Sequence, residues 1–445
     1  MTLTGDIADF VAGFSQADLP DEALAFARTA VTDLTAVMLA AASEPAIAIL
    51  SGGCRPVAEG ATALLDDARR FDPADAARIS GTAAHALDYD DVAFRCHPSA
   101  VLVPAIMAEA ESRHLSGRAV LGAYIVGFEV WGEIAGREAD PYHDAGWHPT
   151  SVIGPVATAA AISFLRRLDV DRTRAALSLS CSAAGGVIAN FGSMTKPYHV
   201  GKAARAAIEA VDLAERGMSA GEDAIGAANG LLAALSPKGR YDIAGPLRLG
   251  AWWQAVPSPL TFKSYPVCFA AHRIIDAVLT LAEAERIAPD DVAEVHVQIR
   301  KTQGRLLRFS DPQDGLEAKF SAHFAVASAL IRGAVGLSEL TTSFIRSEAV
   351  RAMTRRVHFP GRLDDCPCGP DADRVVIALR DGRHVDSGEL PGLTRPFHLE
   401  EKFLDCCAAG GIANGAALFA AFMRLEEVAD VAAIAGMVRR GDDPA

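Results

Sequence analysis

Aromatic residues and positive charge are both scarce in this sequence. Only 7% of its 445 residues are aromatic, and 42 lysines and arginines face 56 aspartates and glutamates, giving a formal net charge of −14. A surface this acidic repels the phosphates of nucleic acids, and no run of basic residues offsets the repulsion locally. We therefore expect no nucleic-acid partner.

Long apolar runs are absent as well. No uninterrupted apolar stretch reaches the roughly 18 residues that span a bilayer, and the N-terminal segment carries Asp6 and Asp9 without a basic leader. The eight cysteines are scattered rather than arranged as a disulfide framework. These features predict a cytoplasmic protein with reduced thiols and no membrane partner.

Cofactor motifs are missing too. No Gly-x-Gly-x-x-Gly follows a predicted strand, and no phosphate-binding loop ends in Gly-Lys-Ser/Thr. One tetrathiolate is conceivable on paper, although neither pair has the usual two-residue gap, and it would consist of Cys366, Cys368, Cys406 and Cys407. We expect no metal and no organic cofactor.

What the chain does contain is alanine and apolar side chains. Half of its residues are hydrophobic, and abundant alanine favours helices because alanine is the best helix former. The length exceeds the roughly 250–300 residues at which single cores stop growing. We predict a mainly α fold: a large all-helical domain at 1–265, completed by 397–445, with an inserted smaller α+β domain at 266–396.

Apolar periodicity supports the helical part. A three- to four-residue spacing predicts one helix from Asp21, whose side chain can cap it, and another from Thr150 to Arg167, with Thr150 as the cap. A third helix at 177–189 is interrupted by a pair of glycines, 185 and 186, which predicts close packing or a break.

The period changes to two near residue 290. Alternating apolar residues predict a strand at 295–299, and 375–379 with 384–387 reads as a hairpin around the turn Asp381–Gly382. Helical patterns return at 318–332 and 400–437.

Four segments place polar residues in apolar surroundings: HALDYDDVAFRCHPSA at 85–100, GWHPTS at 146–151, SMTKPYHVGKAA at 193–204 and LTFKSYPVCFAAHRIIDA at 260–277. Taken singly, each candidate has an ordinary structural explanation, such as a turn aspartate, a loop histidine or a surface lysine. Taken together they suit proton transfer beside a carboxylate, which needs an aspartate or histidine base and cations that hold the substrate.

At these segments the chain resembles the MmgE/PrpD family, which includes 2-methylcitrate dehydratase, cis-aconitate decarboxylase and iminodisuccinate epimerase. The most specific motifs are HALDYDD with HPSA, GWHPTS, TKPYHVGKAA and EAKFSAHFAVASAL at 317–330. The resemblance implies a cofactor-free homodimer with its active site between a helical and an α+β domain. It also implies the catalytic residues Asp88, His97, His148, Lys196 and His272.

Four further residues are candidates for substrate binding, namely Asp91, Lys202, Lys263 and His323. The chain departs from the cis-aconitate decarboxylase pattern at Val92, where that pattern has a threonine, and at Phe324, where it has a tyrosine. Both changes remove a hydroxyl from the expected site, so the identity of the acid stays open.

We therefore expect a lyase, either a dehydratase or a decarboxylase, acting on a small di- or tricarboxylate such as 2-methylcitrate or cis-aconitate. The alternatives are an epimerase or isomerase of a dicarboxylate such as iminodisuccinate, and a non-catalytic binding protein of the same fold. Because Pro197 biases the preceding residue toward extended backbone, Lys196 is expected on a rigid loop, where Lys196→Ala would abolish turnover and leave the fold intact.

Overall fold

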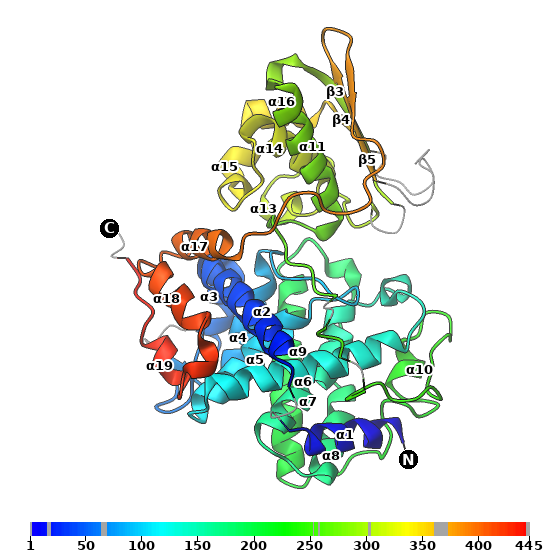
Figure 1. The fold of residues 1–445 in the computed structure, drawn as a ribbon, viewed down its shortest axis with the longest axis vertical. Coiled ribbons are helices and arrows are strands. Elements are labelled where there is room, and N and C mark those ends of the chain that lie inside the picture. The colour runs from blue at the N-terminus through cyan, green and yellow to red at the C-terminus, as the bar shows by residue number, and fades with distance from the viewer. Residues whose placement is uncertain are drawn as a thin grey trace. The chain divides into compact units, whose positions relative to one another are not determined.

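The computed structural model describes residues 2–15, 19–63, 69–251, 253–256, 259–300, 304–359 and 373–441 (Figure 1). It is 55% helical with only small sheets, which confirms a mainly α fold. The chain forms two compact units: unit 1 is Met1–Phe262 with Leu399–Ala445, and unit 2 is Lys263–His398.

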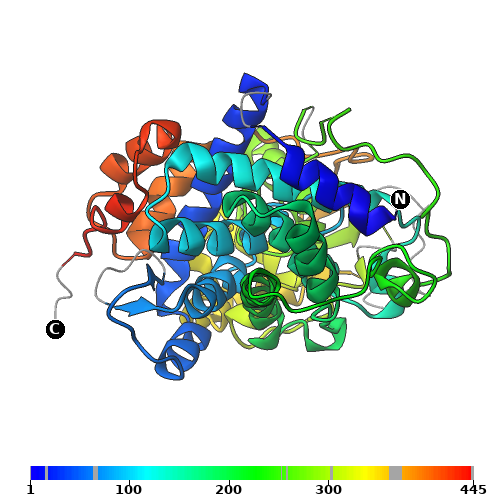
Figure 2. The same cartoon turned by 90° about the horizontal axis from the view of Figure 1, so that it is seen from below.

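Unit 1 is built from helices of both chain ends and one two-stranded ribbon, β1 (Ala61–Thr62) with β2 (Arg70–Phe71). Its helices are α1 (Leu3–Gly13), α2 (Asp21–Ala40), α3 (Pro45–Gly52), α4 (Pro73–Ala86), α5 (Pro98–Ser112), α6 (Gly117–Gly136), α7 (Pro149–Leu165), α8 (Val170–Cys181), α9 (Thr195–Glu215), α10 (Leu231–Leu235), α17 (Leu399–Ala409), α18 (Gly415–Phe422) and α19 (Ala432–Ala435). The red C-terminal helices lie beside blue and cyan helices from the first third of the chain (Figures 1 and 2), and α17 packs on α2.

The starts and ends of three helices differ from the sequence prediction. Pro20, not Asp21, is the N-cap of α2, so Asp21 lies in the first turn, where its charge favours the helix dipole. His148, not Thr150, is the N-cap of α7. The helix predicted at 177–189 ends at Cys181, and Gly186, with φ at 142°, lies in the following turn, which only glycine adopts readily.

A close crossing of α4 and α9 sets the geometry of unit 1. A Cβ added to Gly201 of α9 would lie 2.1 Å from the carbonyl oxygen of Arg78 and 2.3 Å from Oγ1 of Thr82, both on α4. A Cβ on Gly81 of α4 would likewise lie 3.0 Å from Cα of Gly201. The two backbones therefore touch, which places the C-terminal end of α4 beside the N-terminal end of α9.

Unit 2 holds a four-stranded sheet of order β4-β3-β5-β6, in which only β3 and β4 are parallel. Its elements are α11 (His272–Glu285), β3 (Val292–Gln298), α13 (Gly315–Ala318), α14 (Ala322–Arg332), α15 (Thr342–Ile345), α16 (Glu348–Thr354), β4 (Val357–His358), β5 (Arg374–Leu379) and β6 (His384–Asp386). The predicted hairpin is confirmed as β5 and β6, with Gly382 at φ 91° in its turn. The predicted domain boundaries stay a prediction.

Two helices of unit 1, at 21–43 and 117–136, are long and apolar enough to cross a bilayer by length and composition. No uninterrupted apolar run indicated them, because polar residues are spaced along both. Their apolar windows are 72% and 83% buried inside the protein, as in the core helices of a globular unit.

The α4–α9 crossing gives a testable prediction. Gly201→Ala gains up to about 1 kcal/mol of helix propensity, but the new methyl group would collide with backbone, and overpacking costs about 1–3 kcal/mol. We expect a net loss of stability in denaturant unfolding. Gly136→Ala, where no atom lies within 4 Å of the added Cβ, is the control and should not destabilise. A Gly201→Ala protein as stable as wild type would show that the helices do not depend on this contact.

Candidate active site

A buried ion pair joins the end of α4 to the start of α9. Nζ of Lys196 lies 2.5 Å from Oδ1 of Asp88, and the two residues are only 5% and 3% exposed. Nζ of Lys196 also lies 5.1 Å from the ring centroid of Phe191, a cation–π distance. A positive charge is thus held inside a strongly acidic protein.

The backbone at both partners differs from the prediction. Lys196 is not on an extended loop but in the first turn of α9, and Pro197 follows it there because a first-turn residue needs no N–H partner. Asp88 has φ at 51°, in the left-handed region that costs most residues energy but suits aspartate better than most. Such a conformation persists only where the surroundings enforce it.

Asp90 holds two imidazoles. Its Oδ2 lies 2.7 Å from Nδ1 of His85 and 3.0 Å from Nδ1 of His97. Nδ1 of His97 also lies 2.8 Å from the backbone oxygen of Asp91. Because an oxygen of this kind can only accept, both histidines carry a proton on Nδ1, and a neutral ring then presents a lone pair at Nε2.

Burial and the contact between Asp90 and the imidazoles together set the pKa values of Asp90 and His85. Burial alone would raise the pKa of Asp90, but the two imidazoles outweigh it and hold the pKa well below its usual range. For His85 burial dominates and lowers the pKa to about 4, although Asp90 opposes it. At neutral pH His85 is therefore uncharged.

A second pair of imidazoles lies against the first. His148 is 1% exposed, and its Nδ1 lies 3.3 Å from Nδ1 of His199, so one ring donates and the other accepts. The rings of His85 and His148 are stacked with centroids 5.5 Å apart. Burial, followed by the nearby His85, lowers the pKa of His148 well below its usual value. Burial and then Lys202 lower that of His199.

Three helices begin at this cluster. His97 is the N-cap of α5, His148 is the N-cap of α7, and Lys196 lies in the first turn of α9. Neither N-cap histidine makes a side-chain cap hydrogen bond. The positive ends of three helix dipoles thus meet beside a lysine and neutral imidazoles, an arrangement suited to anions. We name this set the His–Lys cluster; it comprises His85, Asp88, Asp90, His97, His148, Lys196 and His199.

Unit 1 brings together four of the five residues predicted to be catalytic, Asp88, His97, His148 and Lys196. Their catalytic roles remain predictions. His85, Asp90 and His199 were not among the predicted site residues, although all three belong to the motifs HALDYDD and TKPYHVGKAA. The short spacing of His85 and Asp90 within one motif was the only feature of the sequence that could have indicated their contact.

A second buried network supports the turn that carries Asp88. Nζ of Lys402, on α17, lies 2.8 Å from Oδ1 of Asp33 on α2 and donates to the backbone oxygen of Tyr89 at 2.8 Å. Nζ of Lys402 is also 4.1 Å from the ring centroid of Tyr89. Burial raises the pKa of Asp33, and Lys402 opposes that rise. The turn after α4 is therefore held by contacts with α2, near the start of the chain, and α17, near its end.

Two residues predicted to bind substrate lie at the edge of the cluster. Asp91 is fully buried, and burial raises its pKa well above the usual value, with Ser99 opposing and Asp33 adding to the rise. It therefore lies in the protein interior, close to Asp33 and Lys402. Lys202 lies on α9, partly exposed and close enough to His199 to lower the pKa of that ring.

The remaining predicted residues belong to unit 2. Lys263 and His272 are fully buried, and Nε2 of His272, at the start of α11, lies 3.3 Å from the backbone oxygen of Val267. His323 lies in the first turn of α14 and lines a cavity of about 390 Å³ with His296 and His358. Their part in catalysis remains a prediction.

The two positions that depart from the decarboxylase pattern have ordinary structural roles. Val92 pairs with Thr261 in an isolated antiparallel bridge, with N–H to oxygen distances of 2.9 and 2.8 Å. Phe324 is fully buried in α14, near Phe344.

The cluster also contains side chains of the kinds that bind metal ions. Within the described part of the chain, one set of three ligand atoms, from His85, Asp90 and His97, lies within 4.8 Å of one another. Both Nδ1 atoms donate to Asp90, so a metal ion would have to displace both protons. Cys366 and Cys368 lie outside the described residues, and burial raises the pKa of Cys406 to about 12 and that of Cys407 to about 11, which disfavours thiolates. The absence of a metal stays a prediction.

Comparison with known proteins identifies the family. The family model of the MmgE/PrpD N-terminal domain matches residues 5–244, and that of the MmgE/PrpD C-terminal domain matches residues 265–410. The chain belongs to the MmgE/PrpD family. The first family domain contains the whole described His–Lys cluster, and the second contains His272 and His323.

Named relatives of this MmgE/PrpD protein include cis-aconitate decarboxylases of Mus musculus, 28% identical over 331 residues, and of Homo sapiens, 29% identical over 334 residues. Each match covers 70% of this chain and 66% or 67% of the relative, about two thirds of its length. A cis-aconitate decarboxylase-like protein of Aspergillus oryzae is 27% identical over 424 residues, covering 86% of this chain and 85% of the relative.

The low pKa of His85 predicts how stability depends on pH. Unfolding returns its pKa from about 4 to about 6.5, so the unfolded chain binds more protons between these values. The stability that neutral His85 contributes is complete above about pH 6.5 and is lost as pH falls toward about 4. It amounts to about 3 kcal/mol, at about 1.4 kcal/mol per unit of pKa.

We expect the free energy of unfolding of wild type to fall between about pH 7 and about pH 4 by about 3 kcal/mol more than that of His85→Asn. Asparagine keeps an N–H donor toward Asp90. Asp91, whose raised pKa acts with the opposite sign, is present in both proteins and cancels. His384→Asn, at an exposed histidine of β6, is the control. Parallel pH curves for wild type and His85→Asn would rule out this linkage.

Proposed function

We propose that this chain is a cofactor-free carboxy-lyase that decarboxylates a small unsaturated tricarboxylate of the cis-aconitate type. The observation that carries the proposal is the buried Lys196, placed beside three helix N-termini and four imidazoles. That environment attracts carboxylates and can move protons. The names of the relatives support the lyase class and this choice of substrate.

The reaction asks for two things from the protein. The bond between a substrate carbon and one carboxylate breaks, carbon dioxide leaves, and the electron pair stays on carbon, conjugated with the neighbouring double bond and carboxylate. A proton then adds to that carbon. Lys196 and the helix N-termini would hold the retained carboxylates and stabilise the charge that develops on them. An imidazole would deliver the proton.

The proton donor must first become charged, because burial keeps His85 and His148 neutral in the free protein. A bound polycarboxylate brings negative charge next to them, and an opposite charge raises the pKa of a histidine. The bound substrate would thus favour protonation of the imidazole, with the proton taken from solvent. His148 is the candidate donor, since its Nδ1 is engaged with His199 and its Nε2 has no hydrogen-bond partner within the described residues.

Asp88 would stabilise and position the ammonium group of Lys196. With Oδ1 of Asp88 at 2.5 Å from Nζ of Lys196, the carboxylate compensates part of the hydration that the buried ammonium group loses. An arriving substrate carboxylate would share this ammonium group with Asp88. The ion pair would therefore hold the ammonium group of Lys196 in position for a substrate carboxylate, in addition to joining the end of α4 to α9.

The alternatives rest on the same residues. A dehydratase would use the imidazoles to remove a proton and release water. The hydroxyls missing at Val92 and Phe324 favour this alternative, because both positions depart from the cis-aconitate decarboxylase pattern. The comparisons lend no support to an isomerase.

Product analysis in D2O separates these reactions. With cis-aconitate we expect carbon dioxide release and one deuteron at the new C–H bond for each molecule released. Dehydration of 2-methylcitrate would give an alkene without carbon dioxide, and epimerisation would exchange deuterium into unchanged substrate. Turnover of 2-methylcitrate with none of cis-aconitate would overturn the decarboxylase proposal and leave the dehydratase.

The Asp88–Lys196 pair gives a double-mutant test. Lys196→Met removes a charge-assisted contact and should lower the rate by about 10²–10³. The buried contact of Asp88 with Lys196 corrects the expectation of an unaffected fold, because losing one partner of a buried pair costs about 3–5 kcal/mol.

Adding Asp88→Asn to Lys196→Met removes the second charge and should restore part of this stability without restoring activity. Unfolding curves and initial rates of wild type, both single variants and the double variant complete the cycle. A Lys196→Met protein with more than about a tenth of wild-type activity would remove Lys196 from the chemistry.

A further inference from the structure

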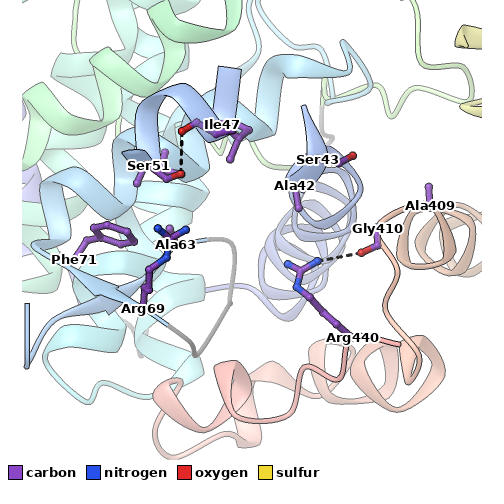
Figure 3. A pocket seen from close by; sticks show the side chains of 12 residues that line it. Ala42, Ser43, Ile47, Ser51, Ala63, Arg69, Phe71, Ala409, Gly410 and Arg440 are labelled. Carbon is purple, nitrogen blue, oxygen red and sulfur yellow. Dashed lines mark hydrogen bonds between the residues drawn. The ribbon is translucent and has the colours of Figure 1, made fainter. Parts of the chain in front are cut away.

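A cavity of unit 1 lies outside the His–Lys cluster and shares no residue with it (Figure 3). Its volume is about 360 Å³, within the range of small-molecule sites. Its lining comes from the segment after α2, from α3, the β1–β2 ribbon, α4, the end of α17 and the C-terminal segment, namely Ala42, Ser43, Ile47, Ala48, Ser51, Ala63, Arg69, Phe71, Ile79, Ala409, Gly410 and Arg440.

Two guanidinium groups line this cavity from separate segments, Arg69 beside β2 and Arg440 near the C-terminal end (Figure 3). The guanidinium carbon of Arg69 lies 5.7 Å from the ring centroid of Phe71, which is itself 2% exposed and therefore fixed. Nη1 of Arg440 donates to the backbone oxygen of Gly410 at 3.1 Å. Both guanidinium groups are thus anchored, yet each keeps further N–H donors.

Neither arginine is neutralised within the cavity. Among residues 2–441, as far as the structure describes them, neither Arg69 nor Arg440 forms an ion pair with a carboxylate, and the lining includes no aspartate or glutamate. In a chain of net charge −14, two uncompensated guanidinium groups on one cavity are a local positive site. Guanidinium forks match carboxylate and phosphate oxygens.

The rest of the lining limits the ligand. Ile47, Ile79 and Ala63 give the cavity an apolar wall, and the hydroxyl of Ser43 adds a donor. The volume and the two arginines suit a small anion, such as a carboxylate of a few carbon atoms or a phosphate.

We propose that this cavity is a second anion site, which binds a small carboxylate or phosphate between Arg69 and Arg440. A ligand held by both would link the β1–β2 ribbon to the C-terminal segment. The cavity also borders α4, which carries His85 of the cluster, and two helices of the network that holds the turn: Ile79 lies about 9 Å along α4 from His85, and Ala409 about 10 Å along α17 from Lys402, at 1.5 Å per residue. Ala42 follows α2, which carries Asp33.

Isothermal titration with inorganic phosphate and with succinate tests the proposal. The Lys196→Met background weakens anion binding at the His–Lys cluster, so we expect the remaining site in that protein to be the cavity. Adding Arg69→Gln or Arg440→Gln should weaken its binding at least tenfold, because a hydrogen bond to a charged group contributes about 1.5–3 kcal/mol. Adding Arg172→Gln, at an exposed arginine of α8, should leave it unchanged.

The same comparison between wild type and an otherwise unaltered Arg69→Gln/Arg440→Gln protein isolates the cavity without reliance on Lys196→Met. Thermal melts without anion check that the folds match. Tighter binding of phosphate than of succinate identifies phosphate as the ligand class, and the reverse identifies a carboxylate. No binding at millimolar concentration, or affinity that survives both arginine substitutions, would overturn the proposal.

Discussion

The contact of Lys402 with Asp33 and with the backbone of Tyr89 is the constraint on which the cluster depends. The turn after α4 contains Asp88 in a left-handed conformation that an isolated chain would leave. A lysine without its counter-ion would not remain inside unit 1, and a turn without that lysine would lose the hydrogen bond to its central carbonyl. The position of Asp88, and with it that of Lys196, therefore follows from this buried ammonium group.

Several buried ionisable groups around the turn have a partner. The two ammonium groups, Lys196 and Lys402, each have an aspartate as partner, and a further buried aspartate, Asp90, is paired with imidazole N–H groups. His85 stays neutral at neutral pH because burial, which lowers its pKa to about 4, outweighs the attraction of Asp90. Neutral imidazoles therefore lie close to the ammonium group of Lys196.

Sequence reasoning reached the helical content, the hairpin and four members of the cluster, because those features are local. His97 and His148 precede prolines, and Asp88 and Lys196 lie in polar motifs within apolar stretches. What it missed depends on long-range packing. Asp33 and Lys402 lie in helices that carry other charged residues, they are separated by most of the chain, and no local pattern pairs them.

The errors at helix starts have the same origin. Thr150 looks like a cap, but its hydroxyl accepts the N–H of His97, a contact across 53 positions. Lys196 looks extended before Pro197, yet a first-turn proline is compatible with a helix once Gly201 lets α9 approach α4. Local rules describe what a residue allows, and tertiary contacts select among the allowed states.

The pairing of Asp33 with Lys402 also sets an order for events on the ribosome. At about 5–20 residues per second, roughly 20–75 s pass between the synthesis of these two residues. During that interval the nascent helices of unit 1 carry a buried-to-be carboxylate without its partner, while all of unit 2 is being made. The turn that carries Asp88 can therefore reach its final form only after α17 has left the exit tunnel, so the His–Lys cluster is completed late in synthesis, although most of its residues belong to the first half of the chain.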